Sequence, residues 1–126
     1  MIIDTHSFLW WAEDSPRLSR KARAVFADGN SRLLWSVAST WELAIKVGIG
    51  RLRLPEPVLE YVMSRMARHG IDSLALEHSH AARVATLPHH HGDPFDRVLI
   101  AQALVEGVPV LTADPRFKEY GVDVVW

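Results

Sequence analysis

The chain has 126 residues, of which 48% are hydrophobic, and a net charge of −1 at neutral pH. This length and apolar content predict a single domain, residues 1–126, that can bury a core without covalent support. The sequence contains no cysteine, which excludes disulfides and thiolate metal ligands and leaves hard oxygen ligands for any metal chemistry. The charge balance argues against a strongly basic nucleic-acid-binding body, so contact with nucleic acid would need a local basic patch.

The distribution of apolar residues argues against targeting to a membrane. The N-terminus reaches Asp4 without a basic lead or a long apolar run, unlike a secretory signal peptide. The most apolar later stretch, Val98 to Ala113, is interrupted by Glu106, Gly107 and Pro109 and is too short to span a bilayer. We therefore expect a cytoplasmic protein with no membrane role.

The first half of the chain predicts two strands and four helices. Ser19 is a suitable N-cap for the second helix, and the first helix can continue beyond Pro16. The expected strands are Ile2–Ile3 and Leu33–Val37, and the expected helices are Phe8–Ala12, Arg20–Ala27 ending at Gly29, Ser39–Val47 ending at Gly48, and a segment introduced by Pro55-Glu56-Pro57 that runs to His69 and closes at Gly70.

The second half continues the alternation of strands and helices. The expected elements are a strand at Ser73–Leu76, a helix at His80–Thr86, a polar loop at Pro88–Phe95, a helix from Asp96 to Glu106, and strands at Val108–Thr112 and Val122–Val125. Such alternation implies right-handed crossovers and a mostly parallel sheet with helices on both faces. The predicted fold class is therefore α/β, a three-layer α/β/α sandwich, whose strand order this pattern does not determine.

Four carboxylates follow the expected strands or lie in the first turns of the helices after them. They are Asp4, Glu42, Asp96 and Asp114. In a parallel sheet these places are neighbours, because ligands bind beyond the carboxyl ends of the strands. Converging carboxylates repel one another unless a proton or a cation intervenes. The pattern predicts a site for Mg²⁺ or Mn²⁺, which bind carboxylate and phosphate oxygens.

Each acid also has an ordinary structural explanation. Asp4 can cap the first helix, and the spacing of Ser39 and Glu42 is that of a capping box, which spacing alone favours for Glu42. Asp96 suits the helix macrodipole, and Asp114 before Pro115 is a common turn opener. Capping does not explain why all four acids follow strands on one edge of the sheet.

Several short motifs, taken in order, span nearly the whole chain. They are Asp4-Thr5-His6, Ser39-Thr40-Trp41-Glu42-Leu43-Ala44-Ile45-Lys46, Gly50-Arg51-Leu52, His91-Gly92-Asp93-Pro94-Phe95-Asp96-Arg97, Leu99-Ile100-Ala101-Gln102-Ala103 and Leu111-Thr112-Ala113-Asp114. Together these motifs resemble those of the PIN-domain ribonucleases of the VapC toxin family. The resemblance implies a PIN-like fold and a Mg²⁺- or Mn²⁺-dependent endoribonuclease toxin that hydrolyses RNA phosphodiester bonds and inhibits translation. It further implies a homodimer and a VapB-type antitoxin that neutralises the toxin.

The resemblance also assigns site residues. The positions that match the family's catalytic and metal-binding acids are Asp4, Glu42, Asp96 and Asp114. Asp93 is a competitor for the third position, and its alternative is to cap or shape the loop. Asp96 is favoured because its distance to Ala101-Gln102-Ala103 matches the family pattern.

Four further residues are candidate substrate contacts. Thr5 and Thr112 could donate to a carboxylate or a phosphate, or could satisfy turns. Arg97 could contact RNA phosphate or pair with an acid. Lys46 belongs to a basic cluster beside Glu42.

Histidines and tryptophans offer competing interpretations. His89-His90-His91 and His78-x-His80 could form a transition-metal site, but we expect surface-loop histidines, because a zinc site needs ligands on rigid, supported elements. The five tryptophans are expected to anchor the core and interfaces. In an antitoxin complex, an apolar antitoxin segment would lie in a groove formed by Trp10, Trp11 and the helix containing Val58 to Met66. The segment would direct a basic side chain toward the acids.

Two other classes of function compete with the ribonuclease. A phosphoacceptor signalling domain would place an aspartate after the middle strand, whereas Ser73–Leu76 is followed by Glu77-His78. A noncatalytic PIN-fold binding module would be expected to lack one or more of the four acids, and all four are present. The acids favour an enzyme.

Overall fold

The structure is a computed structural model that describes residues 1–126. Its centre is a five-stranded sheet in the order β3-β2-β1-β4-β5, and every neighbouring pair is parallel. The strands are β1 (Ile2–Ile3), β2 (Leu34–Ser36), β3 (Asp72–Leu74), β4 (Val110–Leu111) and β5 (Val124–Val125). The predicted α/β fold with a parallel sheet is confirmed, and the structure adds the strand order.

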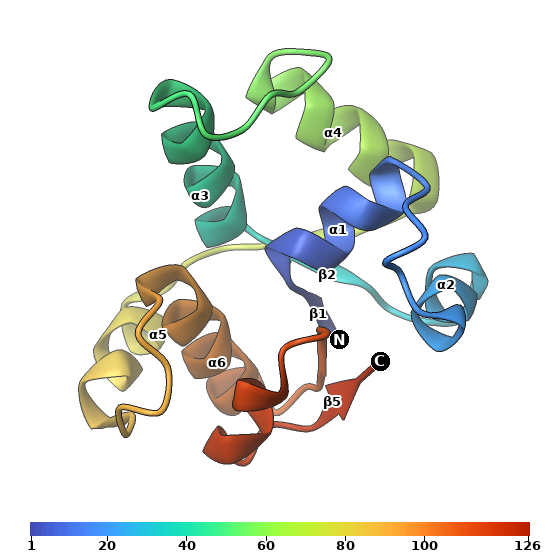
Figure 1. Ribbon diagram of the computed structural model, residues 1–126. Coiled ribbons are helices and arrows are strands. Elements are labelled where there is room, and N and C mark those ends of the chain that lie inside the picture. The colour runs from blue at the N-terminus through green and yellow to red at the C-terminus, as the bar shows by residue number, and fades with distance from the viewer.

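Helices cover both faces of the sheet (Figure 1). They are α1 (Thr5–Ala12), α2 (Arg20–Ala27), α3 (Val37–Gly48), α4 (Val58–His69), α5 (His78–Arg83) and α6 (Pro94–Glu106), with 3₁₀ turns η1 (Val84–Thr86) and η2 (Pro115–Tyr120). No helix is long and apolar enough to cross a bilayer.

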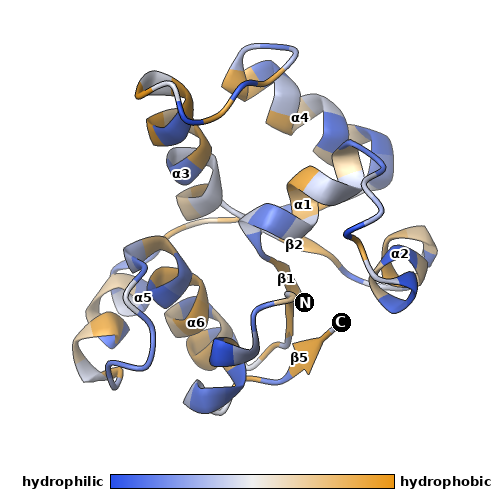
Figure 2. Ribbon diagram, in the orientation of Figure 1, coloured by the Kyte–Doolittle hydropathy of each residue, from blue (hydrophilic) through white to orange (hydrophobic).

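Alternating side chains of the short strands divide the core into two clusters. Ile3, Trp35 and Leu111 point into the cluster with α1, α2 and α4, whereas Ile2, Leu34 and Val110 point into the cluster with α6 and η2. Figure 2 shows β1, β2 and β5 as mainly hydrophobic and the helices as mixed, as expected for strands covered by helices on both faces. Two-residue strands suffice because both faces of β1 and β4 are fully buried.

Three predicted helix boundaries, at Ser19, Gly70 and Gly107, are confirmed. Ser19 caps α2 by accepting a hydrogen bond from the Ala22 amide at 3.0 Å. Gly70 and Gly107 end α4 and α6 with φ of 64° and 65°, the left-handed conformation that glycine adopts without a Cβ clash. The expectation that the first helix continues beyond Pro16 is wrong, because α1 ends at Ala12 and Asp14 has a φ of 52°.

The start of α3 differs from the prediction in a way that affects the site. Ser36 caps this helix by accepting from the Ala38 amide at 3.1 Å, so the helix begins at Val37 and Ser39 already lies inside it. The Ser39 hydroxyl has no hydrogen-bond partner. The predicted Ser39–Glu42 capping box is therefore wrong. The Glu42 carboxylate does not cap α3 and can form hydrogen bonds with residues outside this helix turn.

Candidate metal centre

The four predicted acids come together beyond the carboxyl ends of the central strands. Asp4 directly follows β1, and Asp114 lies just past β4. Glu42 projects from α3, which follows β2, and Asp96 lies in the first turn of α6. The charges of Asp4, Glu42 and Asp114 all act on Asp96, which identifies one electrostatic cluster.

Asp4 serves both as a helix cap and as a member of this cluster. Its Oδ1 accepts from the Ser7 amide at 2.7 Å, and its Oδ2 accepts from Thr112 Oγ1 at 2.5 Å. Burial raises the pKa of Asp4, whereas the hydrogen bonds from Ser7 and Thr112 oppose that rise. The two explanations that the sequence left open for Asp4 are thus compatible.

Glu42 is held by two side chains that the sequence marked as substrate contacts. It is 2% exposed. Its Oε1 accepts from Thr5 Oγ1 at 2.7 Å, and its Oε2 accepts from Lys46 Nζ at 2.5 Å. Thr5 and Lys46 therefore orient and partly neutralise Glu42.

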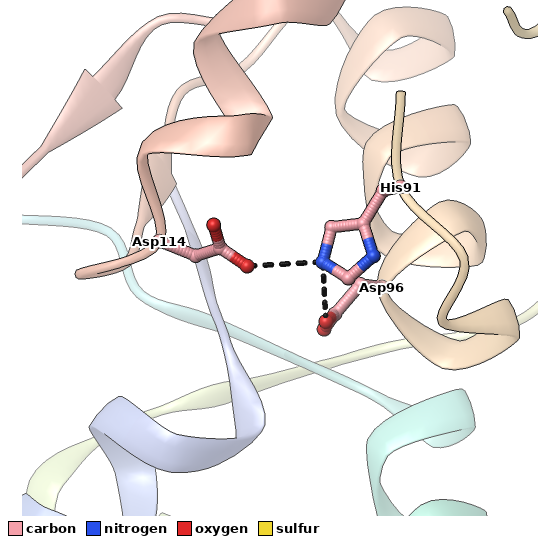
Figure 3. Close-up of side chains that lie close together, drawn as sticks. All are labelled: His91, Asp96 and Asp114. Carbon is pink, nitrogen blue, oxygen red and sulfur yellow. Dashed lines mark hydrogen bonds and ion pairs between the residues drawn. The ribbon is translucent and has the colours of Figure 1, made fainter. Parts of the chain in front are cut away.

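Asp96 and Asp114 form the more accessible side of the cluster, and His91 lies between them (Figure 3). Their side chains are 18% and 19% exposed. His91 Nε2 is 3.0 Å from Asp96 Oδ2 and 2.9 Å from Asp114 Oδ2. The facing ligand atoms of these three residues all lie within 4.8 Å of one another.

The environment separates the pKa values of these two aspartates widely. Burial, followed by the charges of Asp93, Asp4, Glu42 and Asp114, raises the pKa of Asp96 to about 8. Burial also opposes ionisation of Asp114, but hydrogen bonds from Arg116 and His91 outweigh it and lower the pKa of Asp114 to about 2. At neutral pH the cluster therefore holds a proton that a cation could replace.

Asp93 has the capping role that the sequence gave as its alternative. One of its carboxylate oxygens accepts from the amides of Phe95 and Asp96 at 2.8 and 3.2 Å and so starts α6. Asp96, one turn further, points toward the cluster. This geometry supports the choice of Asp96 over Asp93 as the third acid.

His91 is the site residue that sequence reasoning missed. It was expected in a surface loop, but it is 3% exposed and its ring contacts two of the acids. Its amide donates to the Tyr120 hydroxyl at 2.7 Å, and its ring meets Phe117 edge-on. Both aromatic residues belong to η2, so only the tertiary fold brings His91 inward. The sequence feature that could have identified His91 as a site residue is its position two residues before Asp93, the N-cap of α6.

The other histidine motif does not form a metal site. His80 is fully buried, but its Nε2 meets Glu106 at 2.7 Å and its Nδ1 accepts from the Glu77 amide at 3.0 Å. These contacts tie α5 to α6. Both ring nitrogens of His80 therefore have protein partners.

Arg97 and Thr112 are used inside the fold rather than presented to solvent. The Arg97 guanidinium, although adjacent to Asp96 in sequence, donates to the Pro88 carbonyl at 2.8 Å and the Tyr120 hydroxyl at 3.2 Å. Thr112 is fully buried and holds Asp4 while accepting from the Asp114 amide at 3.0 Å. Thr112 thus takes the carboxylate partner that was one of its two predicted roles, and both groups are engaged by protein partners in this structure.

A pocket of about 380 Å³ adjoins the acids on the α1 side. Asp4 and Asp114 form part of its wall, and His6, Trp10 and Arg17 line the remainder with Ala113 and Pro115. Trp10 packs at 5.8 Å between ring centroids against Trp126, and at 5.9 Å against His6. This pocket places a cation and two aromatic rings beside the carboxylates.

The donor set suits a hard divalent cation. Asp4, Asp96 and Asp114 offer carboxylate oxygens, and Glu42 is buried beside them. Burial first, and then the charges of the neighbouring acids, raise the pKa of Asp96. Mg²⁺ and Mn²⁺ prefer such oxygen ligands. The residues present therefore fit the cation expected from the sequence.

Comparison with known proteins identifies the class of protein that this fold and acidic site define. The chain matches the PIN domain over residues 1–123. Ribonuclease VapC22 of Mycobacterium tuberculosis is 30% identical over 121 residues, covering 95% of this chain and 91% of that protein. Ribonuclease VapC16 of the same organism is 42% identical over 71 residues, covering 53% of this chain and 50% of that protein.

Solved structures agree on the fold. The DNA-bound VapBC complex of Salmonella typhimurium contains a chain with a TM-score of 0.74 and 19% identity, covering 98% of this chain and 95% of that one. VapBC2 of Rickettsia felis, bound to a promoter DNA fragment, gives a TM-score of 0.72 and 12% identity, covering 99% and 97%. The chain belongs to the PIN-domain family and, within it, to the VapC type.

Proposed function

We propose that this protein is a metal-dependent endoribonuclease toxin that hydrolyses RNA phosphodiester bonds. The observation that carries the proposal is the convergence of four acids from separate segments around Asp96, whose pKa is raised to about 8 by burial and by the other acids. The acidic cluster therefore favours binding of a positively charged ion. The names of VapC16 and VapC22, both ribonucleases, support hydrolysis of RNA over the signalling and noncatalytic alternatives.

Asp4, Asp96 and Asp114 would hold Mg²⁺ or Mn²⁺, with Glu42 completing the acidic wall behind them. When bound, such a cation would polarise the scissile phosphate and activate a water for in-line attack. The hydroxyls of Thr112 and Thr5 fix Asp4 and Glu42 by hydrogen bonds of 2.5 and 2.7 Å. The carboxylates are therefore oriented before the substrate arrives, which lowers the reorganisation that the reaction requires.

The pocket beside Asp4 and Asp114 supplies the surface on which RNA would lie. Arg17 can neutralise a backbone phosphate, and the exposed ring of His6 with the half-buried ring of Trp10 offers a face on which an unpaired base can stack. These residues replace Arg97 and Thr112 as substrate contacts. The expected substrate is single-stranded or looped RNA, because a paired base cannot present its face to these rings.

The experiment that tests the function measures cleavage of total RNA by purified protein with Mg²⁺, Mn²⁺ or EDTA. We expect cleavage that requires metal and is lost in Asp4→Asn. Asp123→Asn is the matched control, because Asp123 is exposed and only its main-chain carbonyl has a described contact. Equal cleavage by wild type and Asp4→Asn would contradict the assignment, and intact RNA under all metal conditions would favour a noncatalytic module.

A VapB-type antitoxin is the proposed partner, since the related solved structures are VapBC complexes. A second pocket, of about 360 Å³, lies between α1, α2 and α4 and is lined by Trp11, Phe26, Arg65 and His69 among others. Trp11 and Phe26 stack at 4.7 Å and provide an apolar floor. Val62 and Met66, expected in this groove, are instead buried in the core.

The toxin would act as a homodimer on cytoplasmic RNA and so inhibit translation. The outer side of α3 leaves Trp41, Ile45 and Ile49 exposed by 57%, 36% and 61%, at the four-residue spacing of one helix face. Such a stripe suits a second copy of the chain. For the dimer, Trp41→Glu should shift the free toxin from dimer to monomer in light scattering.

For the antitoxin, coexpression with the neighbouring small gene product should restore growth. Trp11→Glu should weaken that rescue. Rescue that is insensitive to Trp11→Glu would exclude the α1–α2–α4 groove.

A further inference from the structure

His91 occupies a position between two segments that lie far apart in the sequence. Asp96 comes from the first turn of α6 and Asp114 from the loop after β4, and the single nitrogen Nε2 contacts both at 3.0 and 2.9 Å (Figure 3). Asp96 and Asp114 carry like charges when ionised and would separate without a donor between them. The ring therefore links two carboxylates that the backbone leaves independent.

The other ring nitrogen fixes which proton His91 carries. Nδ1 accepts a hydrogen bond from the Asp93 amide at 3.1 Å, so Nδ1 must present its lone pair. The ring proton consequently resides on Nε2, where it faces the carboxylates. In this tautomer the Nε2 proton is donated to Asp114 Oδ2, Asp96 Oδ2 lies 3.0 Å from the same nitrogen as a second electrostatic contact, and no free lone pair on Nε2 remains for a metal ion.

The fold restrains the ring from several directions. The His91 amide donates to the Tyr120 hydroxyl at 2.7 Å, and that hydroxyl also receives a hydrogen bond from Arg97. Arg97 in turn holds the Pro88 carbonyl of the same loop. The side chain is 2% exposed, so rotating it away would require displacement of the loop.

We propose that His91 is a positioning residue of the metal centre: its Nε2–H donates to Asp114, the same ring edge contacts Asp96, and the ring thereby sets the distance between the two carboxylates without binding the cation itself. This inference rests on the proposed metal-dependent function. Metal sites commonly depend on such outer hydrogen bonds, whose loss weakens metal affinity by about 10- to 100-fold. The competing arrangement, in which His91 is a third ligand, would require the proton to leave Nε2 and the Asp93 contact to change.

Mn²⁺ binding to the full-length protein tests the inference without RNA. We would titrate Mn²⁺ by electron paramagnetic resonance into wild type, His91→Ala, His91→Gln and the neighbouring control His90→Ala. We expect His91→Ala to bind Mn²⁺ about tenfold more weakly or worse, and His90→Ala to match wild type. His91→Gln should lose less, because the glutamine amide can donate toward the carboxylates. Unchanged affinity in His91→Ala would overturn the inference.

Pulsed resonance on the Mn²⁺-loaded protein separates positioning from ligation. We expect the wild-type spectrum to lack the nitrogen coupling of a directly bound imidazole from His91. A coupling that is present in wild type and lost in His91→Gln would make His91 a ligand and overturn the proposal, even if His91→Ala fails to fold. If wild type binds no Mn²⁺ and cleaves no RNA, the proposed function fails; if it does both and His91→Ala binds Mn²⁺ equally, only this inference fails.

Discussion

The inner pair of acids, Asp4 and Glu42, and the outer pair, Asp96 and Asp114, are held in different ways. Each inner carboxylate has its own donors: Ser7 and Thr112 for Asp4, and Thr5 and Lys46 for Glu42. The outer carboxylates share one imidazole, and a surface arginine, Arg116, adds a second contact only for Asp114. The inner pair is thus held by separate donors, whereas the outer pair is held through one shared imidazole and is partly exposed to solvent.

This difference indicates that the two pairs would have different roles in binding a metal ion. The inner pair is almost completely buried, and its orientation is set by hydroxyls that cannot leave. The outer pair combines partial exposure with opposite pKa shifts, so one carboxyl is protonated near neutral pH while the other is ionised. A cation would approach from the outer side and replace the proton on Asp96. Breaking each pair separately tests this division.

The largest effect is expected for Asp96→Asn, which removes the outer carboxyl that the other acids surround. Losing several kcal/mol of transition-state stabilisation corresponds to a fall in cleavage rate of about a hundredfold or more. Asp93→Asn should retain most activity, because asparagine also caps helices. Initial rates on a fluorescent RNA substrate measure both. A larger loss in Asp93→Asn would reverse the assignment of the third acid.

The pH dependence of stability distinguishes the two outer carboxylates, Asp96 and Asp114. The pKa of Asp96 is raised from 3.8 to about 8 on folding, so the folded protein binds the extra proton between these values. The unfolded state therefore binds fewer protons there, and metal-free stability should fall as pH rises from about 4 to about 8. The raised pKa of Asp4 acts in the same direction.

Melting temperatures in EDTA from pH 5 to pH 8 measure this fall. The slope should be smaller in Asp96→Asn, and the stabilisation by Mg²⁺ in wild type should grow with pH because cation and proton compete. Asp114 contributes the opposite dependence only at low pH, since its stabilising contribution is lost as pH falls toward about 2. A flat wild-type profile would show that Asp96 is not protonated in the folded protein.

An intermediate effect is expected from Thr112→Val, which keeps the shape but removes the donor to Asp4. The substitution also leaves the Asp114 amide without its acceptor. A hydrogen bond to a charged group contributes about 1.5–3 kcal/mol, so metal affinity should fall by about tenfold or more. Thr5→Val, which removes one donor from Glu42, is the comparison within the inner pair. Calorimetric titration with Mn²⁺ measures both, and unchanged affinity in both would show that the hydroxyls do not orient the acids.

The smallest effect is expected from Lys46→Met. Its ammonium pairs with Glu42 Oε2, but the lysine side chain is 32% exposed and a bound cation supplies positive charge nearby. We expect a loss of about 1 kcal/mol in unfolding free energy in EDTA and a smaller loss with Mg²⁺. Urea denaturation under both conditions is the measurement. A greater loss with Mg²⁺ than without it would mean that Lys46 organises the loaded site.

The amino-acid sequence alone determined the parts of this protein that depend on local chemistry and periodicity. Ser19, Gly70 and Gly107 set helix ends through contacts within a few residues, and apolar runs between helices indicated a parallel sheet. The placement of Asp4, Glu42, Asp96 and Asp114 after strands was enough to predict their convergence, because parallel strands share one carboxyl edge. The resemblance to the VapC family favoured Asp96 over Asp93, because its distance to Ala101-Gln102-Ala103 matches the family pattern.

Only the tertiary structure decided which groups complete the site. The N-cap of α3 is Ser36, three residues before the predicted Ser39, because β2 ends there. Glu42 therefore does not cap the helix and instead accepts a hydrogen bond from Thr5, 37 residues away. His91 entered the acidic cluster because Tyr120 and Phe117, far along the chain, hold its loop inward. The same packing withdrew Arg97 from the site. Hydrogen bonds between distant segments form only after the strands are ordered, so local sequence patterns do not predict them.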